Sequence, residues 1–441
     1  MCSKNEGFHA ECFPGATLPL LDLCLTPRHH LGPVTRLLPG DCMRPLIVSQ
    51  LMHPVLRVVA PALAIAASAC ADAPLAPSSE TDPVMVEATA ALAFRQVSAG
   101  AFGSCGVTSD DRAYCWAGPL GNGTQSSSTR PVAVAGGLRF LQVTVGDGHS
   151  CGVTTDNRAY CWGFNDNGKL GDGTTTQRNS PVLVAGGLRF RQVEAGNYHT
   201  CGITTTDVAY CWGWNQTGQL GDGTEVRQRL RPVAVAGGLR FRQIVAGYGH
   251  TCGLTLNRRA FCWGYGAQGQ IGDGKTFQRR SPRAVAGGRE FTHVAAGGSH
   301  SCGVATDGRA FCWGDNRYGE IGDGTTAQRL VPTATVGPAF SGVSAGGGHT
   351  CGVTPAKALY CWGWHIYGQT GTGQSGNETP QPRPTLVPGG RLFATVSGGI
   401  FHTCGVTTGS RAYCWGNNQS GELGDGTTTL RSRPVAVVGP S

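Results

Sequence analysis

Seven pairs of cysteines recur along the chain of 441 residues, and the two members of each pair are ten residues apart. In the segment HSCGVTTDNRAYCWG, Cys151 and Cys161 flank a short polar run. Thiols at this spacing could form disulfides, bind zinc together with His149, or stay free and pack as small apolar groups. The pairs are Cys105 with Cys115, Cys151 with Cys161, Cys201 with Cys211, Cys252 with Cys262, Cys302 with Cys312, Cys351 with Cys361, and Cys404 with Cys414.

The residues around Cys151 and Cys161 favour a disulfide across a β-hairpin. If the chain turns at Asp156, the two thiols become direct cross-strand neighbours, with the Cβ separation of about 3.5–4.5 Å that a disulfide requires. A structural zinc site normally has four ligands and closer cysteine spacing, and the first repeat has Gly103 in place of the histidine. We therefore expect seven disulfides and no metal site, and free thiols are the second interpretation.

A histidine lies two residues before the first cysteine in six of the seven repeats. A catalytic base needs a nucleophile or an acid within reach, and no such partner recurs beside these histidines. We expect them to make hydrogen bonds between strands, and we predict no catalytic residue and no cofactor. They are His149, His199, His250, His300, His349 and His402.

These side chains must be positioned by a repeat of about 50 residues. Phenylalanines at 94, 140, 190, 241, 291, 340 and 393 begin successive repeats, in steps of 46 to 53 residues. Within residues 190–240, four short strands are indicated by FRQVEAG, HTCGITT, AYCWGW and RPVAVAG. Such a period predicts an all-β fold, a seven-bladed β-propeller of four-stranded antiparallel blades. Its repeats are 94–139, 140–189, 190–240, 241–290, 291–339, 340–392 and 393–441.

The repeat resembles that of the regulator of chromosome condensation family. The resemblance extends from the Ala-Gly step through HSCGVTTDNRAYCWG to the NxxGxLGDGT loop, and it covers residues 94–441. It implies a seven-bladed propeller. The cysteine pair is an addition to the usual motif. Residues 52–70 also have the pattern of an export signal, which does not suit the nuclear member that exchanges nucleotide on a small GTPase, so we do not expect that activity. Bacterial members include a secreted propeller that inhibits β-lactamases, and such a binding role suits this chain better.

The N-terminal part of the chain has a different composition. Residues 52–70, MHPVLRVVAPALAIAASAC, combine a basic start, an apolar stretch of about fifteen residues and small residues before Cys70. This predicts a signal peptide whose lipobox-like end is lipidated at Cys70, after an upstream extension at 1–51. Residues 71–93 are then a tether, in which 83–86 could add a closing strand to the ring. A disordered N-terminus with a hydrophobic patch is the alternative.

We therefore expect an exported protein of a bacterial cell envelope, either secreted or held at the membrane only through a lipid anchor. Without residues 1–69 the chain has 30 basic and 23 acidic side chains, a net charge of +7. Many of the arginines follow a GDG loop, as Arg178 follows Asp172. They could form a basic rim for nucleic acid or anionic glycan, but pairing with the aspartate of the same loop is favoured, so we predict no nucleic-acid partner.

Function should lie where the repeats differ. In an up-and-down blade, the loops after the first and third strands emerge on one face, which we call the loop face. Large aromatic residues there predict the binding of a protein partner. We expect the chain itself to be a monomer. A cell-surface glycan is the alternative ligand, and an enzyme, a lyase or hydrolase using the central pocket, is a further one. An enzyme would need unlike polar residues at the ring axis, where mostly Ala-Gly and Gly-Gly steps are expected. The candidate contact residues are Phe164, Tyr198, Trp214, Tyr248, Tyr265, Trp364 and Phe401.

Overall fold

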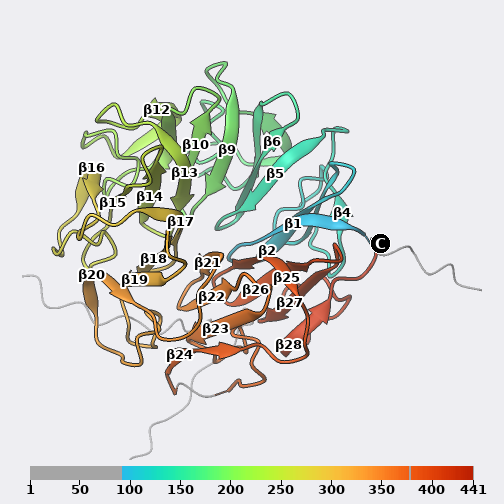
Figure 1. Ribbon diagram of the computed structural model, residues 1–441. Coiled ribbons are helices and arrows are strands. Elements are labelled where there is room, and N and C mark those ends of the chain that lie inside the picture. The colour runs from blue at the N-terminus through green and yellow to red at the C-terminus, as the bar shows by residue number, and fades with distance from the viewer. Residues whose placement is uncertain (1–91, 377–378, 441) are drawn as a thin grey trace, which may run out of the picture. The chain divides into compact units, whose positions relative to one another are not determined.

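The structure is a computed structural model, and it describes residues 92–376 and 379–440. The predicted signal peptide, Cys70 and the tether up to residue 91 lie outside the described residues. Within the described part of the chain there are twenty-eight β-strands, no helix, and therefore no helix able to cross a membrane. The strands form seven four-stranded antiparallel sheets, as predicted, and the sheets are the blades of a β-propeller (Figure 1).

Each blade is made of four strands that are consecutive in the sequence. The innermost strands are β1 (Phe94–Ala99), β5 (Phe140–Val145), β9 (Phe190–Ala195), β13 (Phe241–Ala246), β17 (Phe291–Ala296), β21 (Gly342–Ala345) and β25 (Phe393–Gly398). The second strands are β2 (Gly103–Thr108), β6 (His149–Thr154), β10 (His199–Thr204), β14 (His250–Thr255), β18 (His300–Ala305), β22 (His349–Val353) and β26 (His402–Thr407).

The outer two strands of each blade carry the second cysteine and the blade edge. The third strands are β3 (Ala113–Ala117), β7 (Ala159–Gly163), β11 (Ala209–Trp214), β15 (Ala260–Gly264), β19 (Ala310–Gly314), β23 (Leu359–Gly363) and β27 (Ala412–Gly416). The fourth strands are β4 (Val132–Ala133), β8 (Arg178–Leu183), β12 (Gln228–Ala234), β16 (Arg279–Ala284), β20 (Arg329–Ala334), β24 (Gln381–Leu386) and β28 (Arg431–Ala436).

The ring closes because blade 7 packs directly against blade 1. Strand β26 contacts β1, and Figure 1 shows the red blade of β25–β28 beside the blue strands β1 and β2. The outer position of blade 7 is filled by β28, so every blade is built from its own repeat. The candidate closing strand at 83–86 lies outside the described residues.

The hydrophobic core is divided into seven clusters, each between two neighbouring blades. Between blades 3 and 4, for example, Ile203 and Leu220 pack against Phe241, Ile244 and Trp263, all of which are buried. Apolar surface on both faces of every blade is thus removed from water, which is the main stabilising contribution in such a fold. The core fixes the spacing of the loops that form the loop face.

Candidate functional site

The cysteine pairs form seven disulfides, as expected. Cys151 lies directly opposite Cys161 in the β6–β7 pair, and Gly152 lies opposite Tyr160, which is the predicted register. The Cα atoms of Cys151 and Cys161 are 4.0 Å apart, slightly closer than the roughly 4.5 Å of a non-hydrogen-bonded cross-strand pair. The ring that covers Gly152 is that of Phe140, since a Cβ there would lie 2.6 Å from Phe140 Cδ1. Disulfides of this number are typical of oxidising compartments.

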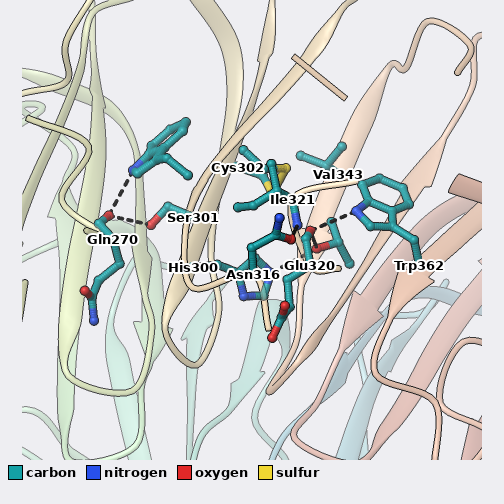
Figure 2. Close-up of a disulfide and its surroundings, with 12 residues drawn as sticks. Gln270, His300, Ser301, Cys302, Asn316, Glu320, Ile321, Val343 and Trp362 are labelled. Atoms are coloured by element: carbon teal, nitrogen blue, oxygen red, sulfur yellow. Dashed lines mark hydrogen bonds between the residues drawn. A yellow bond between two sulfur atoms is a disulfide. The ribbon is translucent and has the colours of Figure 1, made fainter. Parts of the chain in front are cut away.

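The repeated histidines join neighbouring blades. In Figure 2, His300 lies beside the disulfide of Cys302, and its Nε2 atom is 2.9 Å from Thr350 Oγ1 of the next blade. Thr350 donates its own proton to the Glu320 carbonyl at 2.8 Å, and Trp362 Nε1 donates to the same oxygen at 2.8 Å. A histidine, a hydroxyl and a tryptophan therefore link each such pair of blades through one loop carbonyl.

This arrangement assigns the state of the imidazole. Because the Thr350 hydroxyl uses its single proton on a carbonyl, it must accept a hydrogen bond from His300, so Nε2 carries the proton. Burial lowers the pKa of His300 to about 4 and that of His199, His250 and His349 to about 3. Neutral, buried histidines of this kind support the predicted structural role, although the hydrogen bonds run between blades.

A second set of bonds encircles the axis at the end of the inner strands. In each blade, the backbone N–H after an Ala-Gly, Val-Gly or Gly-Gly step donates to the glycine carbonyl of the next blade. The bonds run from Ala101 to Gly146, Asp147 to Gly196, Asn197 to Gly247, Tyr248 to Gly297, Gly298 to Gly346, Gly347 to Gly399 and Ile400 to Gly100, at 2.9–3.4 Å. The ring of backbone bonds narrows the axial channel at the loop face, where the open volume is about 60 Å³.

The arginines near the GDG loops pair as predicted. In five blades the guanidinium lies 2.5–3.0 Å from the aspartate of its own loop: Arg178 with Asp172, Arg229 with Asp222, Arg279 with Asp273, Arg329 with Asp323, and Arg431 with Asp425. Burial opposes ionisation of Asp172, but hydrogen bonds from Thr174 and Arg178 outweigh it and hold the pKa of that carboxyl below its usual value. These arginines are part of the loop architecture.

Most of the candidate contact residues gather in two groups on the loop face. Tyr198 and Trp214 pack edge to face, with ring centroids 5.0 Å apart, and Tyr198 is 37 % exposed. Trp364 and Phe401 lie 5.9 Å apart on the other side of the ring. Because one member of each pair comes from the loop after the first strand and the other from the end of the third strand, both loops do share one face.

Three further candidates are placed differently. Phe164 is 52 % exposed beside Gly148, and Tyr265 is half-buried against Gly249. Tyr248 crosses the axis, because a Cβ on Gly347 of blade 6 would lie 3.0 Å from its hydroxyl. That hydroxyl is buried, and burial raises its pKa well above the usual value. Tyr248 therefore covers the axial channel at the loop face.

The loop face includes aromatic residues that the sequence analysis missed. Tyr318 stacks on Trp364 at 5.3 Å, and Tyr367 contacts Trp364 at 5.6 Å. Phe102, in the first turn of blade 1, is 50 % exposed. The shared loop positions of the repeats were the available signal, because Tyr318 and Tyr367 both follow the third strand at the same offset from the CWG motif.

A groove lies where the loop of the first repeat is short. Cys115 and Gly121 are six residues apart, whereas their counterparts Cys161 and Gly171 are ten apart, so four loop residues are missing. The groove has a volume of about 340 Å³ and a largely apolar wall, to which Phe102, Leu120 and Phe164 contribute. The length difference was visible as the shortest step between repeats, but its effect on the surface was not predicted.

Amide side chains join the inner strands below this ring of backbone hydrogen bonds. Gln96 Nε2 donates to Val143 O at 2.9 Å, while Gln96 Oε1 accepts from Val143 N at 3.1 Å. The same two-bond clamp recurs at the next three junctions, and at the fifth the His293 ring takes its place. Blades 6 and 7 have Gly342 and Thr395 at this position.

Different polar residues also line the axis. The expectation that mostly Ala-Gly and Gly-Gly steps would be found there is therefore corrected. Below the ring of backbone bonds is a cavity of about 340 Å³, with Glu194 and His293 in its wall. Burial raises the pKa of Glu194 to about 7 and lowers that of His293. Among the described residues no group of three or more potential metal ligands is present. Glu194 and His293 were not predicted, because the repeat pattern shows only what the repeats have in common.

Comparison with known families agrees with this geometry. A model of the RCC1-like domain matches residues 117–440, and a model of the regulator of chromosome condensation (RCC1) repeat matches residues 94–116. The chain belongs to the RCC1-like domain family. The resemblance seen in the repeats is thereby confirmed, and the RCC1-like propeller occupies residues 94–440 as the two matches together define it.

Solved RCC1-like propellers have the same fold. Human WBSCR16 superposes with a TM-score of 0.65 at 21 % identity, covering 71 % of this chain and 85 % of that one. Prp20p from Saccharomyces cerevisiae gives 0.61 at 22 % identity, covering 69 % and 80 %. Human and mouse E3 ubiquitin-protein ligase HERC2 are 35 % identical over 66 residues, which is 14 % of this chain and 1 % of the length of these relatives.

Proposed function

We propose that this RCC1-like propeller is an exported module that binds a protein partner through its loop face. The observation that carries the proposal is the gathering of partly exposed aromatic side chains on that one face. Aromatic residues are the most frequent energetic anchors of protein interfaces, because a rigid ring buries a large area at little cost in conformational entropy. RCC1-like propellers commonly serve as protein-binding modules, which supports a protein as the partner.

The best anchor points are the two phenylalanines beside the groove of the first repeat. Phe102 is 50 % exposed and Phe164 is 52 % exposed, and both belong to the groove wall. Large apolar side chains that stay half-exposed around an apolar groove favour an interface. The Tyr198 and Trp214 pair and the cluster around Trp364 would extend the contact across the loop face.

The comparison with Prp20p gives limited support. Its structure is described together with its binding properties to Gsp1p and histones, and these partners are those of Prp20p. At 22 % identity the likeness concerns the fold, so we take from it only that such a propeller can present a protein-binding face. The short match to HERC2 carries no activity over to this chain.

Export is the second part of the proposal. The seven disulfides suit an oxidising compartment, and residues 52–70 have the pattern of a bacterial signal peptide ending at Cys70. We propose a monomer in the cell envelope, secreted or attached to the membrane through a lipid on Cys70.

Photo-crosslinking from defined positions tests the binding face. A photoreactive phenylalanine would replace Phe102 or Phe164 in one set, and Leu256 in the matched control. Leu256 is also 50 % exposed, but it lies in the β14–β15 turn on the opposite face. After crosslinking in the native cell envelope, mass spectrometry should find one protein joined to positions 102 and 164 and absent at 256. Equal crosslinking from position 256 would contradict the proposal.

The same face distinguishes a glycan ligand. Trp214→Ala and Trp364→Ala should leave retention on cell-wall polysaccharide unchanged, because both indoles are already packed against other aromatic rings. Loss of retention in either variant would favour the glycan-binding alternative. His293 is a poor candidate for a catalytic base because both of its ring nitrogens are engaged, Nδ1 with Gln243 and Nε2 with Val343 O.

A further inference from the structure

We propose that the axial cavity below the ring of backbone hydrogen bonds is a binding site for a small organic ammonium ion, with Glu194 as its counter-charge. This site is separate from the loop face and goes beyond the proposed protein binding. Its volume of about 340 Å³ falls within the range of about 300–1,000 Å³ that is usual for small-ligand pockets. The propeller therefore has room at its axis for such a ligand.

Glu194 breaks the pattern of its repeat position. In four blades a serine or threonine stands there and accepts a backbone N–H bond from the next blade at 2.9–3.2 Å: Ser98, Thr144, Ser344 and Ser397. Blades 4 and 5 have Val245 and Ala295, so the ring can dispense with a polar atom at this position. The carboxylate of Glu194 is thus not required to join the blades.

The carboxylate also lacks a cationic partner. Glu194 Oε1 accepts hydrogen bonds from Gln142 Nε2 at 2.8 Å and Gln192 Nε2 at 3.0 Å, while Oε2 is reached only by the Thr144 hydroxyl at 3.4 Å. None of the ion pairs among the described residues includes it. Glu194 is only partly exposed, in the cavity wall. A partly desolvated carboxylate without a counter-charge is costly, and a bound cation would reduce that cost.

Neighbouring charged groups do not neutralise Glu194. His293, in the same cavity wall, is held neutral by burial, which lowers its pKa. Arg95 and Arg191 lie on the inner strands of blades 1 and 3, but their guanidinium groups are paired with Asp111 and Asp207. Arg242, at the corresponding position of blade 4, is exposed and does not belong to the cavity wall.

A metal ion fits this cavity poorly. One carboxylate and one neutral histidine with both nitrogens engaged do not make a coordination shell, and the remaining polar groups are amides and hydroxyls. An ammonium group needs only one carboxylate and a few further acceptors. The wall supplies these acceptors through the hydroxyls of Ser344, Thr395 and Ser397.

Access is available from the side away from the loop face. At the loop face, the ring of backbone bonds and Tyr248 narrow the channel. Between blades 6 and 7, where Gly342 replaces the clamping glutamine, a volume of about 210 Å³ adjoins the axial cavity and shares His293 and Thr395 with it. Where the amide clamp is missing, open volume therefore lies directly beside the cavity that contains Glu194.

Titration calorimetry of the folded, disulfide-bonded protein tests this site, with diaminobutane as the probe and uncharged butanediol as its matched control. We expect saturable binding of one diaminobutane per chain and none of butanediol. Because burial raises the pKa of Glu194 to about 7, binding at about pH 6 should release a proton, seen as a dependence of the heat on the buffer.

Variants connect the binding to the carboxylate. Glu194→Gln should weaken diaminobutane binding by at least about tenfold, while Glu225→Gln, at an exposed position, should leave it unchanged. Glu194→Thr copies Thr144 of blade 2, so it keeps the fold if Glu194→Gln does not, and it should lose binding equally. The proposal is overturned if diaminobutane does not bind, if butanediol binds as well, or if a folded Glu194 variant keeps the affinity.

Discussion

The glycine that directly follows each inner strand determines how closely the blades approach one another at the axis. A Cβ at Gly196 would lie 2.6 Å from Gly247 O and 2.8 Å from His199 Cε1. A side chain at this point would therefore separate the N–H and C=O groups that join neighbouring blades. The Ala-Gly step of the repeat is explained by this approach of backbones rather than by a turn.

Gly196→Ala tests this explanation at a single residue. The added methyl should force blades 3 and 4 apart and lower the free energy of unfolding by about 1–3 kcal/mol. Gly342→Ala is the matched control, since no atom lies within 4 Å of its Cβ position, and it should change stability by less than about 0.5 kcal/mol. Equal denaturant midpoints for the two variants would contradict the explanation.

The structural positions of some residues could be predicted from the sequence, and those of others could not. The register of Cys151 opposite Cys161 was predictable, because alternation along two strands and one turn position determine it. The position of Tyr248 over the axis was not, because it depends on Gly347, which is about a hundred residues away in blade 6. Glu194 was missed for the same reason, since the cavity around it is formed by strands from several blades.

At the scale of strands, the inner edges of the blades are joined by side-chain amides. A glutamine can offer one donor and one acceptor, which match the N–H and C=O of a single residue on the next inner strand. Gln96 uses both on Val143. This clamp satisfies backbone groups that would otherwise face the axial cavity, and it is absent where Gly342 and Thr395 replace glutamine.

Exchanging the amide tests the contribution of the clamp. Gln96→Ala should lower the free energy of unfolding by about 1–3 kcal/mol, because it leaves two backbone groups without partners. Gly342→Gln should raise it by about 0.5–1.5 kcal/mol by adding the missing clamp onto blade 7. The exposed Gln228→Ala provides the control. A destabilised Gly342→Gln protein, measured by denaturant unfolding, would show that the position does not accept the amide.

The strands and hairpins were predictable because each is encoded within one repeat of about 50 residues. Period-2 alternation and the glycine-rich turns indicate four strands per repeat, and the structure has these four strands in every blade. The amide clamps and the groove beside Phe102 were not predicted. Both arise between repeats, from the approach of one blade to the next, and a pattern within one repeat carries no information about that distance.

For the whole molecule, the histidine bonds make stability dependent on protonation. Six of the seven junctions contain a buried, neutral histidine bonded to a hydroxyl of the next blade. Protonation at the other ring nitrogen, Nδ1, would place a poorly solvated charge in the core. The ring as a unit should therefore be sensitive to acid.

The direction of the pH dependence follows from the shifted pKa values. Burial holds the pKa of five junction histidines at about 3 to 4 and that of His149 well below the ordinary 6.5, so their contribution is fully present above pH 6.5 and is lost as the pH falls. Glu194 and Glu320 act oppositely, because burial raises their pKa values to about 7 and favours folding at low pH. The histidines outnumber the glutamates, so acid destabilises the ring.

Unfolding should therefore be accompanied by proton uptake that rises from about two protons at pH 6.5 to about four to five near pH 5, and the denaturation midpoint should fall across that window. His250→Gln should reduce the uptake by about one proton, because glutamine can still donate to Ser301 but does not titrate. A midpoint independent of pH, or one that rises on acidification, would contradict the assignment of neutral histidines.

We propose above all that this chain is an exported propeller in which a disulfide joins the second and third strands of every blade. The most direct measurement is a thiol count on the natively exported protein, alkylated after denaturation without reduction and analysed by mass spectrometry. We predict that none of the fourteen paired cysteines will be alkylated, and the same spectrum will show whether Cys70 carries a lipid. Alkylation of all fourteen would contradict the claim.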